Sequence, residues 1–372
     1  MVTEKINRRA VGRRAVVAVS ALTAAAAFAL VAGQAEGVPQ PSVPPAELAT
    51  CSPADLGTLG GRQGNATAVS SNGLVTGYAE DSSGTPHPVV WKSGKASRIV
   101  TGLLSVTPTG INRRGEVVGV GVEPSDLETV GWHWVGGKTT LLRTPAGKVA
   151  VPEAINDTGR IAGALASNDD GGAEPTSGEA PEQPATWASA KAPAKVLPQL
   201  AGDVGGHVYG LNKKGVMVGN SQGLDHFTPT MWDAGGHVTA LEGLGGDWGV
   251  ARAVDDTGVA VGAAVAATGD QQAVLWDVGH QAKKHSWAGG TGVQANGLTR
   301  GNAVGQADVR EKGDIVRTKA VQWGASGNPA VIPPLPGHPG AGVNAASSDG
   351  MVVGFSSDDR GARRPTAWTC TR

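Results

Sequence analysis

Apolar residues in this chain gather in short runs that are separated by turn residues. Residues 207–241 show the pattern clearly, with apolar runs at 207–211, 216–219, 230–232 and 237–241. Runs this short, bounded by Asn, Asp and Gly, are typical of β-strands. No stretch shows the sustained 3.6-residue apolar period of an amphipathic helix. The segment therefore predicts four strands joined by tight turns.

The same unit occurs seven times. A tryptophan ends the third predicted strand of each copy, at intervals of 43 to 53 residues. These tryptophans are Trp91, Trp134, Trp187, Trp232, Trp276, Trp323 and Trp368. A glycine marks the turn before the second strand, and another glycine follows four residues later. The turn glycines are Gly73, Gly115, Gly159, Gly215, Gly258, Gly301 and Gly350. This period predicts an all-β, seven-bladed β-propeller.

The turn residues and the tryptophans have separate structural interpretations. Asn, Asp or Ser caps the turn in six copies, and the turn glycine supplies the positive φ of a hairpin. The second glycine lies inside a strand, where a missing side chain indicates close approach of a backbone or a ring. We predict that this ring is the repeat tryptophan, packed in the core rather than serving as a ligand-binding aromatic. Trp132, Trp248 and Trp287 fall outside the repeat register, so they are the better candidates for exposed aromatics.

The first residues resemble an export signal. A basic start is followed by the uncharged stretch Ala15–Val31 and a small-residue cleavage site at Ala35. The alternative is an uncleaved membrane anchor. Arg13 and Arg14 loosely match a twin-arginine signal, and Sec export fits equally well. We therefore predict a signal peptide at 1–35, a Pro-rich linker at 36–50, a propeller domain at 51–372 and a secreted, extracellular protein.

The composition of the chain limits the kinds of partner that we expect. The chain has a formal charge of −1, 57 glycines and 17% charged residues, which fits short strands and tight turns. Removal of the basic signal leaves the mature chain mildly acidic. Such a balance favours neither nucleic acid nor an anionic membrane as a partner. We expect a monomer that recognises an extracellular ligand.

The two ends of the chain are out of phase with the repeat. A lone strand at Asp55–Leu59 precedes the first copy, and the seventh copy lacks its fourth strand because four residues remain after Trp368. The N-terminal strand can complete that blade and close the ring. Repeat alignment then brings Cys51 and Cys370 together, which predicts a disulfide. The alternative, an open β-solenoid, would place these cysteines at opposite ends.

The repeat is similar to that of a known family. Asp55–Gly61, Ser71–Gly77 and His87–Trp91 resemble the unit of the HAF family of extracellular repeat proteins, and the similarity extends from about Asp55 to Trp368. Members are secreted bacterial chains of largely unassigned function. The resemblance implies a secreted repeat protein and provides no catalytic residue. His87 alone keeps the family's histidine, which argues against a metal site in every copy.

Short motifs for catalysis and metal binding are weak. Ser221 lies in Gly219–Gly223, a Gly-x-Ser-x-Gly match, but a nucleophile elbow needs a following helix. Residues 136–140 resemble the end of a phosphate loop and are better explained as a turn. His280 and His285 are spaced for zinc, although surface histidines are the simpler interpretation. We expect no cofactor.

Calcium is the alternative to that expectation. The loops between second and third strands are acidic, and the longest is 164–183. Its carboxylates are Asp169, Asp170, Glu174, Glu179 and Glu182. They lack the regular ligand spacing of a calcium loop.

Two classes of function remain. The favoured class is a binding or scaffold module for a glycan, cell-wall or protein ligand, because function on such scaffolds lies in loops. The second is a propeller enzyme of glycosidase or lyase type. Carboxylates that converge with an arginine in the central channel would favour the enzyme. No propeller-enzyme signature occurs, and we assign no catalytic residue.

Overall fold

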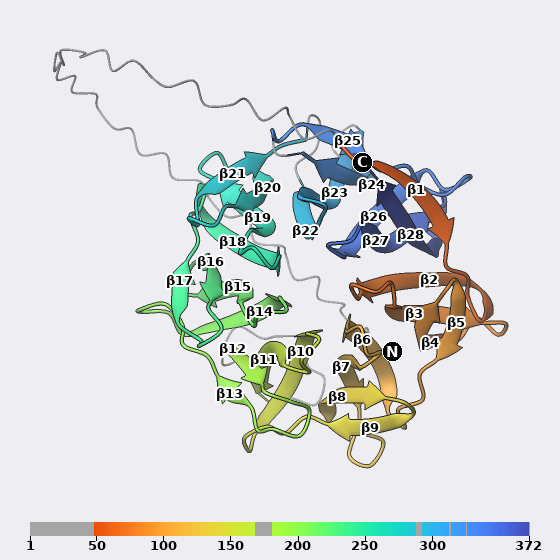
Figure 1. Ribbon diagram of the computed structural model, residues 1–372, viewed down its shortest axis with the longest axis horizontal. Coiled ribbons are helices and arrows are strands. Elements are labelled where there is room, and N and C mark those ends of the chain that lie inside the picture. Colours follow the sequence, from red (N-terminus) through yellow and green to blue (C-terminus); the bar gives the residue numbers. More distant parts are fainter. Residues whose placement is uncertain (1–47, 168–180, 288–291, 312–313, 325, 372) are drawn as a thin grey trace, which may run out of the picture. The chain divides into compact units, whose positions relative to one another are not determined.

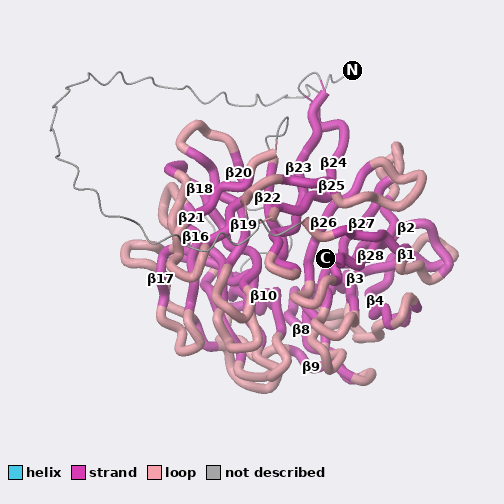
Figure 2. The backbone as a smooth tube through the Cα atoms, turned by 45° about the horizontal axis from the view of Figure 1, so that its top comes forward, coloured by secondary structure: helices cyan, strands magenta, loops and turns pink. Residues whose placement is uncertain are grey.

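The computed structural model describes residues 48–167, 181–287, 292–311, 314–324 and 326–371. The predicted signal segment 1–35 and nearly all of the linker 36–50 lie outside these ranges. All described residues belong to the compact unit Pro44–Arg372. They form strands and loops (Figure 2), and none of them forms a helix long and apolar enough to cross a membrane.

The described residues contain 28 strands, which form antiparallel units of four. Five units are separate sheets, and two are joined by one parallel bridge between Phe227 and Trp248. The first three units are β2 (Gly60–Val69), β3 (Val75–Asp81), β4 (Pro86–Lys92), β5 (Lys95–Arg98); β6 (Leu104–Ile111), β7 (Val117–Val122), β8 (Thr129–Val135), β9 (Lys138–Leu141); and β10 (Lys148–Ile155), β11 (Ile161–Ser167), β12 (Gln183–Trp187), β13 (Lys195–Val196).

The remaining units continue the same order. They are β14 (Gly205–Leu211), β15 (Met217–Gln222), β16 (Phe227–Trp232), β17 (Val238–Ala240); β18 (Gly245–Val254), β19 (Ala260–Ala266), β20 (Gln271–Trp276), β21 (Ala282–His285); β22 (Val293–Thr299), β23 (Asn302–Glu311), β24 (Asp314–Trp323), β25 (Pro329–Val331); and β26 (Gly340–Ala346), β27 (Met351–Ser357), β28 (Arg363–Thr371) with β1 (Thr50–Asp55). Within this compact unit the first strand of each group lies nearest the centre of a ring (Figure 1).

The ring is closed by the N-terminal strand, as predicted. β1 pairs antiparallel with β28, and Cys51 lies opposite Cys370 and forms a disulfide with it. Arg364 strengthens the junction by bonding the Asp55 carboxylate at 3.0 Å. The closing strand runs over Thr50–Asp55, earlier than the predicted Asp55–Leu59, because the chain leaves β28 after Leu56 and Leu59 already donates to the Glu80 carbonyl of the first unit. This closure excludes the open solenoid.

The turn glycines have their predicted role. Each has positive φ, and in six copies its N–H donates to the carbonyl of the capping residue, as Gly215 does to Asn212. The sixth copy instead uses a two-residue turn with Arg300 and Gly301 both at positive φ. Asn212 also reaches the next unit, where its amide donates to the Asp255 carbonyl at 2.8 Å. The capping residues therefore link units as well as shape turns.

The prediction that a tryptophan ring crowds the second glycine is wrong. A Cβ on Gly219 would lie 1.8 Å from the His207 carbonyl oxygen, and the other six copies show the same backbone contact. At Gly119 the Trp132 ring also comes close, at 2.7 Å. The crowding arises because the inner strand makes a β-bulge opposite each second glycine, which pushes a carbonyl toward it.

Six of the seven repeat tryptophans are buried between adjacent units, as predicted. Each indole N–H of these six donates to a backbone carbonyl, such as that of Trp232 to Pro198 at 2.7 Å. Trp134 is the exception, because it is only half-buried. Trp132, two residues earlier on the same face of β8, is fully buried instead, so its prediction as an exposed aromatic is wrong. Trp248 and Trp287 are half-buried.

Candidate functional site

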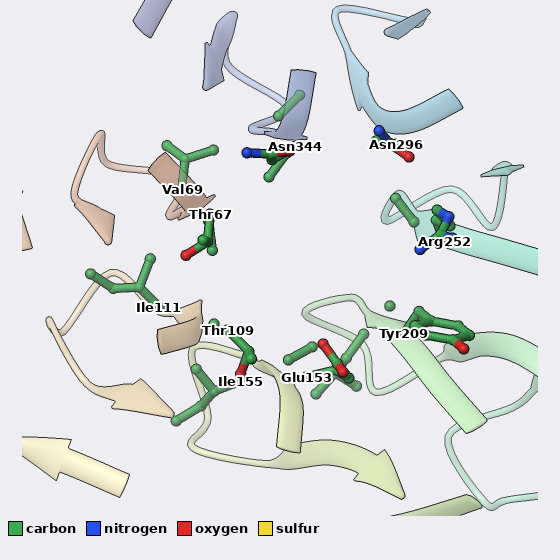
Figure 3. A pocket seen from close by; sticks show the side chains of 18 of the residues that line it. Thr67, Val69, Thr109, Ile111, Glu153, Ile155, Tyr209, Arg252, Asn296 and Asn344 are labelled. Atoms are coloured by element: carbon green, nitrogen blue, oxygen red, sulfur yellow. The ribbon is translucent and has the colours of Figure 1, made fainter. Parts of the chain in front are cut away.

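The β-bulges determine what lines the central channel. Each described inner strand carries one extra residue at its bulge, and these residues surround a cavity of about 410 Å³ (Figure 3). The bulge residues are Thr67, Thr109, Glu153, Tyr209, Arg252, Asn296 and Asn344. The repeated second glycine permits the bulge, so the repeat itself directs one variable side chain per unit toward the channel.

Four bulge residues link neighbouring units. Each donates a side-chain hydrogen bond to a carbonyl of the next inner strand. These bonds run from Thr67 to Pro108 (2.9 Å), Thr109 to Pro152 (2.6 Å), Asn296 to Val343 (2.7 Å) and Asn344 to Ala66 (2.8 Å). Their role is structural, because they satisfy backbone groups exposed by the bulges.

Three consecutive units depart from this arrangement. Among the described residues, the side chains of Glu153, Tyr209 and Arg252 donate no such bond. Glu153 and Tyr209 instead contact His207 on β14, and Arg252 lies over the ring of Tyr209. The His207 Nδ1 lies 2.6 Å from Glu182 and its Nε2 lies 3.4 Å from Glu153. We call these five residues the channel cluster.

Ring stacking orders the same cluster. The imidazole of His207 stacks on the ring of Tyr209, with centroids 4.4 Å apart and planes 13° from parallel. The guanidinium carbon of Arg252 lies 5.3 Å from the Tyr209 centroid, within cation–π range. The side chains thus form a layered array from β14 to β18, which restricts their rotamers before any ligand arrives.

Electrostatics keep the cluster charged. Burial opposes the imidazolium form of His207, but the carboxylates of Glu153 and Glu182 outweigh burial and raise the pKa of His207 to about 9. Burial raises the pKa of Glu182, yet the hydrogen bond to His207 outweighs it, so the pKa of Glu182 lies below its usual value. At neutral pH a protonated histidine therefore lies between two carboxylates.

This ion cluster predicts a loss of stability in alkali. Because folding raises the pKa of His207 from 6.5 to about 9, its stabilising contribution is complete below pH 6.5 and disappears as the pH rises through about 9. Thermal melts of the wild type should show this fall, and His207→Gln should remove that part of the pH dependence. His237→Gln, at an exposed histidine, is the matched control. If the melting temperatures of wild type and His207→Gln change in the same way between pH 6 and pH 10, the assignment is contradicted.

A smaller hollow adjoins the channel cluster. This side pocket, of about 110 Å³, lies between β14–β16 and β18 and shares Glu182, His207, Tyr209 and Arg252 with the cluster. Its other walls include Trp248 and Phe227 and the amide side chains of Asn220 and Gln222. Trp248, which the sequence marked as a candidate for an exposed aromatic, is therefore half-buried in the wall of a pocket.

The sequence motifs for catalysis do not form sites. Ser221 is fully buried on β15, accepts a hydrogen bond from the Leu200 N–H at 3.0 Å, and no helix follows it within the described residues. Residues 136–140 form the turn and start of β9. His285 is buried rather than at the surface, and burial lowers its pKa to about 4, whereas His280 occupies a turn.

The acidic-loop hypothesis remains largely a prediction. Asp169, Asp170, Glu174 and Glu179 lie outside the described residues, while Glu182 belongs to the channel cluster. In the ranges that the structure describes, no group of three or more His, Cys, Asp or Glu side chains is arranged for a metal ion.

No protein-family model and no curated protein matches this chain. Solved structures are similar in fold. A mutant of puromycin hydrolase complexed with PGG has a TM-score of 0.53 at 13% identity, and the match covers 82% of this chain and 52% of that one. Puromycin hydrolase itself gives 0.52 at 12% identity, covering 83% and 52%. The putative TolB from Agrobacterium tumefaciens gives 0.43 at 12%, covering 75% and 94%.

The chain spans about half the length of the two hydrolases. Identity this low shows a shared fold and nothing of activity. The predicted β-propeller class is confirmed.

Proposed function

We propose that this protein is a secreted binding module, related to the HAF-type repeat proteins, that holds an extracellular glycan, cell-wall or protein ligand at the channel cluster. The observation that carries the proposal is the break in the ring of linking hydrogen bonds. Four units use the bulge residue for structure, whereas three adjacent units place Glu153, Tyr209 and Arg252 there. Polar groups withdrawn from structural bonds and gathered in a cavity are the expected signature of a ligand site.

The position of the cluster modifies the expectation of a loop-face site. Glu182 comes from the end of the long acidic loop 164–183, while the other members come from inner strands. Residues on strands are held more rigidly than residues on loops. The proposed ligand therefore enters the channel and contacts the adjoining loop rather than lying on loops alone.

Charge favours binding over hydrolysis at this site. Glu153 and Glu182 converge with Arg252 near the channel, the arrangement that would favour a propeller enzyme. A glycosidase, however, needs one carboxylic acid that keeps its proton through a raised pKa. His207 does the opposite, because it lowers the pKa of Glu182. With its own pKa near 9, His207 is also protonated at neutral pH and is a poor general base there.

The test is ligand capture by the mature chain, residues 36–372. Wild type should bind members of a glycan array or components of a cell-wall pull-down, and Glu153→Gln should weaken that binding about tenfold or more. Glu128→Gln, at an exposed glutamate directly before β8 that lines neither the channel cavity nor the side pocket, should bind as wild type does. Equal binding by both variants would place the ligand elsewhere, and no binding by wild type to any glycan, cell-wall or protein sample would refute the function.

The second candidate, a glycosidase or lyase, rests on the two converging carboxylates. It predicts cleavage of a polysaccharide that Glu153→Gln abolishes. Product release measured on the glycans that bind distinguishes the two functions.

A further inference from the structure

We propose that the side pocket selects a negatively charged sugar residue, with Arg252 pairing to the anionic group and Trp248 lying against the sugar ring. This inference rests on the proposed binding function and names the class of ligand. Three independent features of the pocket support it. Its arginine has no ion-pair partner, its two amide side chains have no hydrogen-bond partners, and its tryptophan occupies a position that is not aromatic in any other repeat.

Arg252 is a cation that lacks a protein anion. Within the part of the chain that the structure describes, no carboxylate lies within ion-pair distance of it, and its buried Nε has no acceptor. A buried charged donor without an acceptor costs free energy, so an anion that enters the pocket recovers that cost. The guanidinium fork matches a carboxylate or a sulfate through two parallel hydrogen bonds.

The nearby carboxylates do not occupy this role. His207 lies between Glu153 and Glu182, at 3.4 and 2.6 Å, and its positive charge offsets part of theirs. Tyr209 lies between His207 and Arg252 in the stack. Arg252 is therefore the positive group of the cluster that remains free to meet a ligand anion.

Two amide side chains supply hydroxyl recognition. Asn220 and Gln222 are two residues apart on β15 and line the same pocket, since alternate residues of a strand share a face. Neither amide group makes a hydrogen bond among the residues described, although Asn220 is only 5% exposed. Each amide offers a donor and an acceptor, the combination that matches adjacent hydroxyl groups of a sugar.

Trp248 is a departure from the repeat. The equivalent residue lies four positions before the bulge residue in every copy, and no other copy has an aromatic residue there. The other copies have Gln63, Ser105, Val149, Gly205, Gly292 and Gly340. Trp248 pairs with Phe227 across a parallel bridge between two units, and both residues line the side pocket. A half-buried indole offers a flat apolar surface with a polar edge, suited to a sugar ring.

The experiment compares four probes by isothermal titration: an oligouronate, its carboxyl-reduced neutral counterpart, a sulfated oligosaccharide and a peptide with a free C-terminal carboxylate. We expect an anionic sugar to bind at least tenfold more tightly than the neutral one, and the stronger of the two anionic sugars identifies the anion. Arg252→Gln should abolish that preference. Trp248→Ala should weaken the charged and neutral sugars alike.

Controls separate a local effect from unfolding. Arg113→Gln, at an exposed arginine in a turn, should keep the wild-type preference, and every variant must retain the wild-type melting curve within a few degrees. If the Arg252→Gln variant folds but has a lower melting temperature than wild type, Arg252→Lys provides a second test. Lysine keeps the positive charge but lacks the two parallel donors of the guanidinium group.

Several results would overturn the inference. These are equal binding of neutral and anionic sugars, a preference that survives Arg252→Gln, tightest binding of the peptide carboxylate, or failure of all four probes. In each case capture of another glycan, cell-wall or protein ligand would leave the proposed binding function standing.

Discussion

Removing the disulfide should destabilise this protein more than almost any other two-residue change. Cys51→Ala with Cys370→Ala opens a loop that joins residues 319 positions apart. For a loop of that length, the chain-entropy model gives a loss of up to about 6 kcal/mol in the free energy of unfolding. The expected result is a fall of the melting temperature by up to about 9 °C, because an unfolding entropy of about 2.1 cal/mol/K per residue makes 1 kcal/mol worth roughly 1.5 °C in a domain of this size.

The effect follows from where the bond lies. β1 is the only described strand of its unit that comes from the other end of the chain, and both cysteines are buried where it pairs with β28. Without the bond, fraying of β1 exposes the edge of β28 and the cluster around Trp368. Opening of the ring therefore precedes loss of the remaining units.

Chemical reduction provides the control. A reductant should lower the melting temperature of wild type and leave the double alanine variant unchanged. Identical melting of oxidised and reduced wild type would show that ring closure does not depend on the bond, and would contradict the role assigned to Cys51 and Cys370.

The closure was predictable from sequence because it depends on the register of the repeat along the chain, and that register is retained when individual residues vary. The seven tryptophans determine the repeat frame, and that frame exposes the strand missing after Trp368. Packing inside one unit is different. Trp132 and Trp134 share a face of β8, and which of them fills the wedge depends on the exact shape of neighbouring side chains. Periodicity alone selected the wrong one.

The channel cluster escaped prediction for a related reason. Its residues are scattered through the sequence, and a missing side chain at the second glycine is compatible with either a ring or a carbonyl nearby. A signal was nevertheless present. At the bulge position of every repeat the sequence has a polar or bulky residue. In four repeats this residue is Thr or Asn, and in the other three it is Glu153, Tyr209 or Arg252. Constant positions of the repeat describe the scaffold, and the variable position between them marks the site.

The second large effect should come from one methyl group. In Gly219→Ala the new Cβ would lie 1.8 Å from the His207 carbonyl and 3.0 Å from the Val208 Cα, both backbone atoms of the adjacent β14. Backbone cannot move aside as a flexible side chain can, so the bulge at Tyr209 must be rebuilt or lost. We expect a loss of about 3 kcal/mol or more in the free energy of unfolding, at the upper end of overpacking effects.

The same substitution should also disable ligand binding, because the bulge sets the positions of His207 and Tyr209. Gly354→Ala meets the Gly342 carbonyl at 2.0 Å in a unit outside the channel cluster. It should destabilise to a similar degree yet keep the affinity of whatever protein remains folded. Gly243→Ala, whose Cβ has its nearest neighbour at 3.9 Å, should be close to neutral. Urea unfolding and ligand titration of the three variants test this prediction. If Gly219→Ala is as stable as Gly243→Ala, the second glycine is not what permits the bulge. The repeat would then not explain how the channel cluster is positioned.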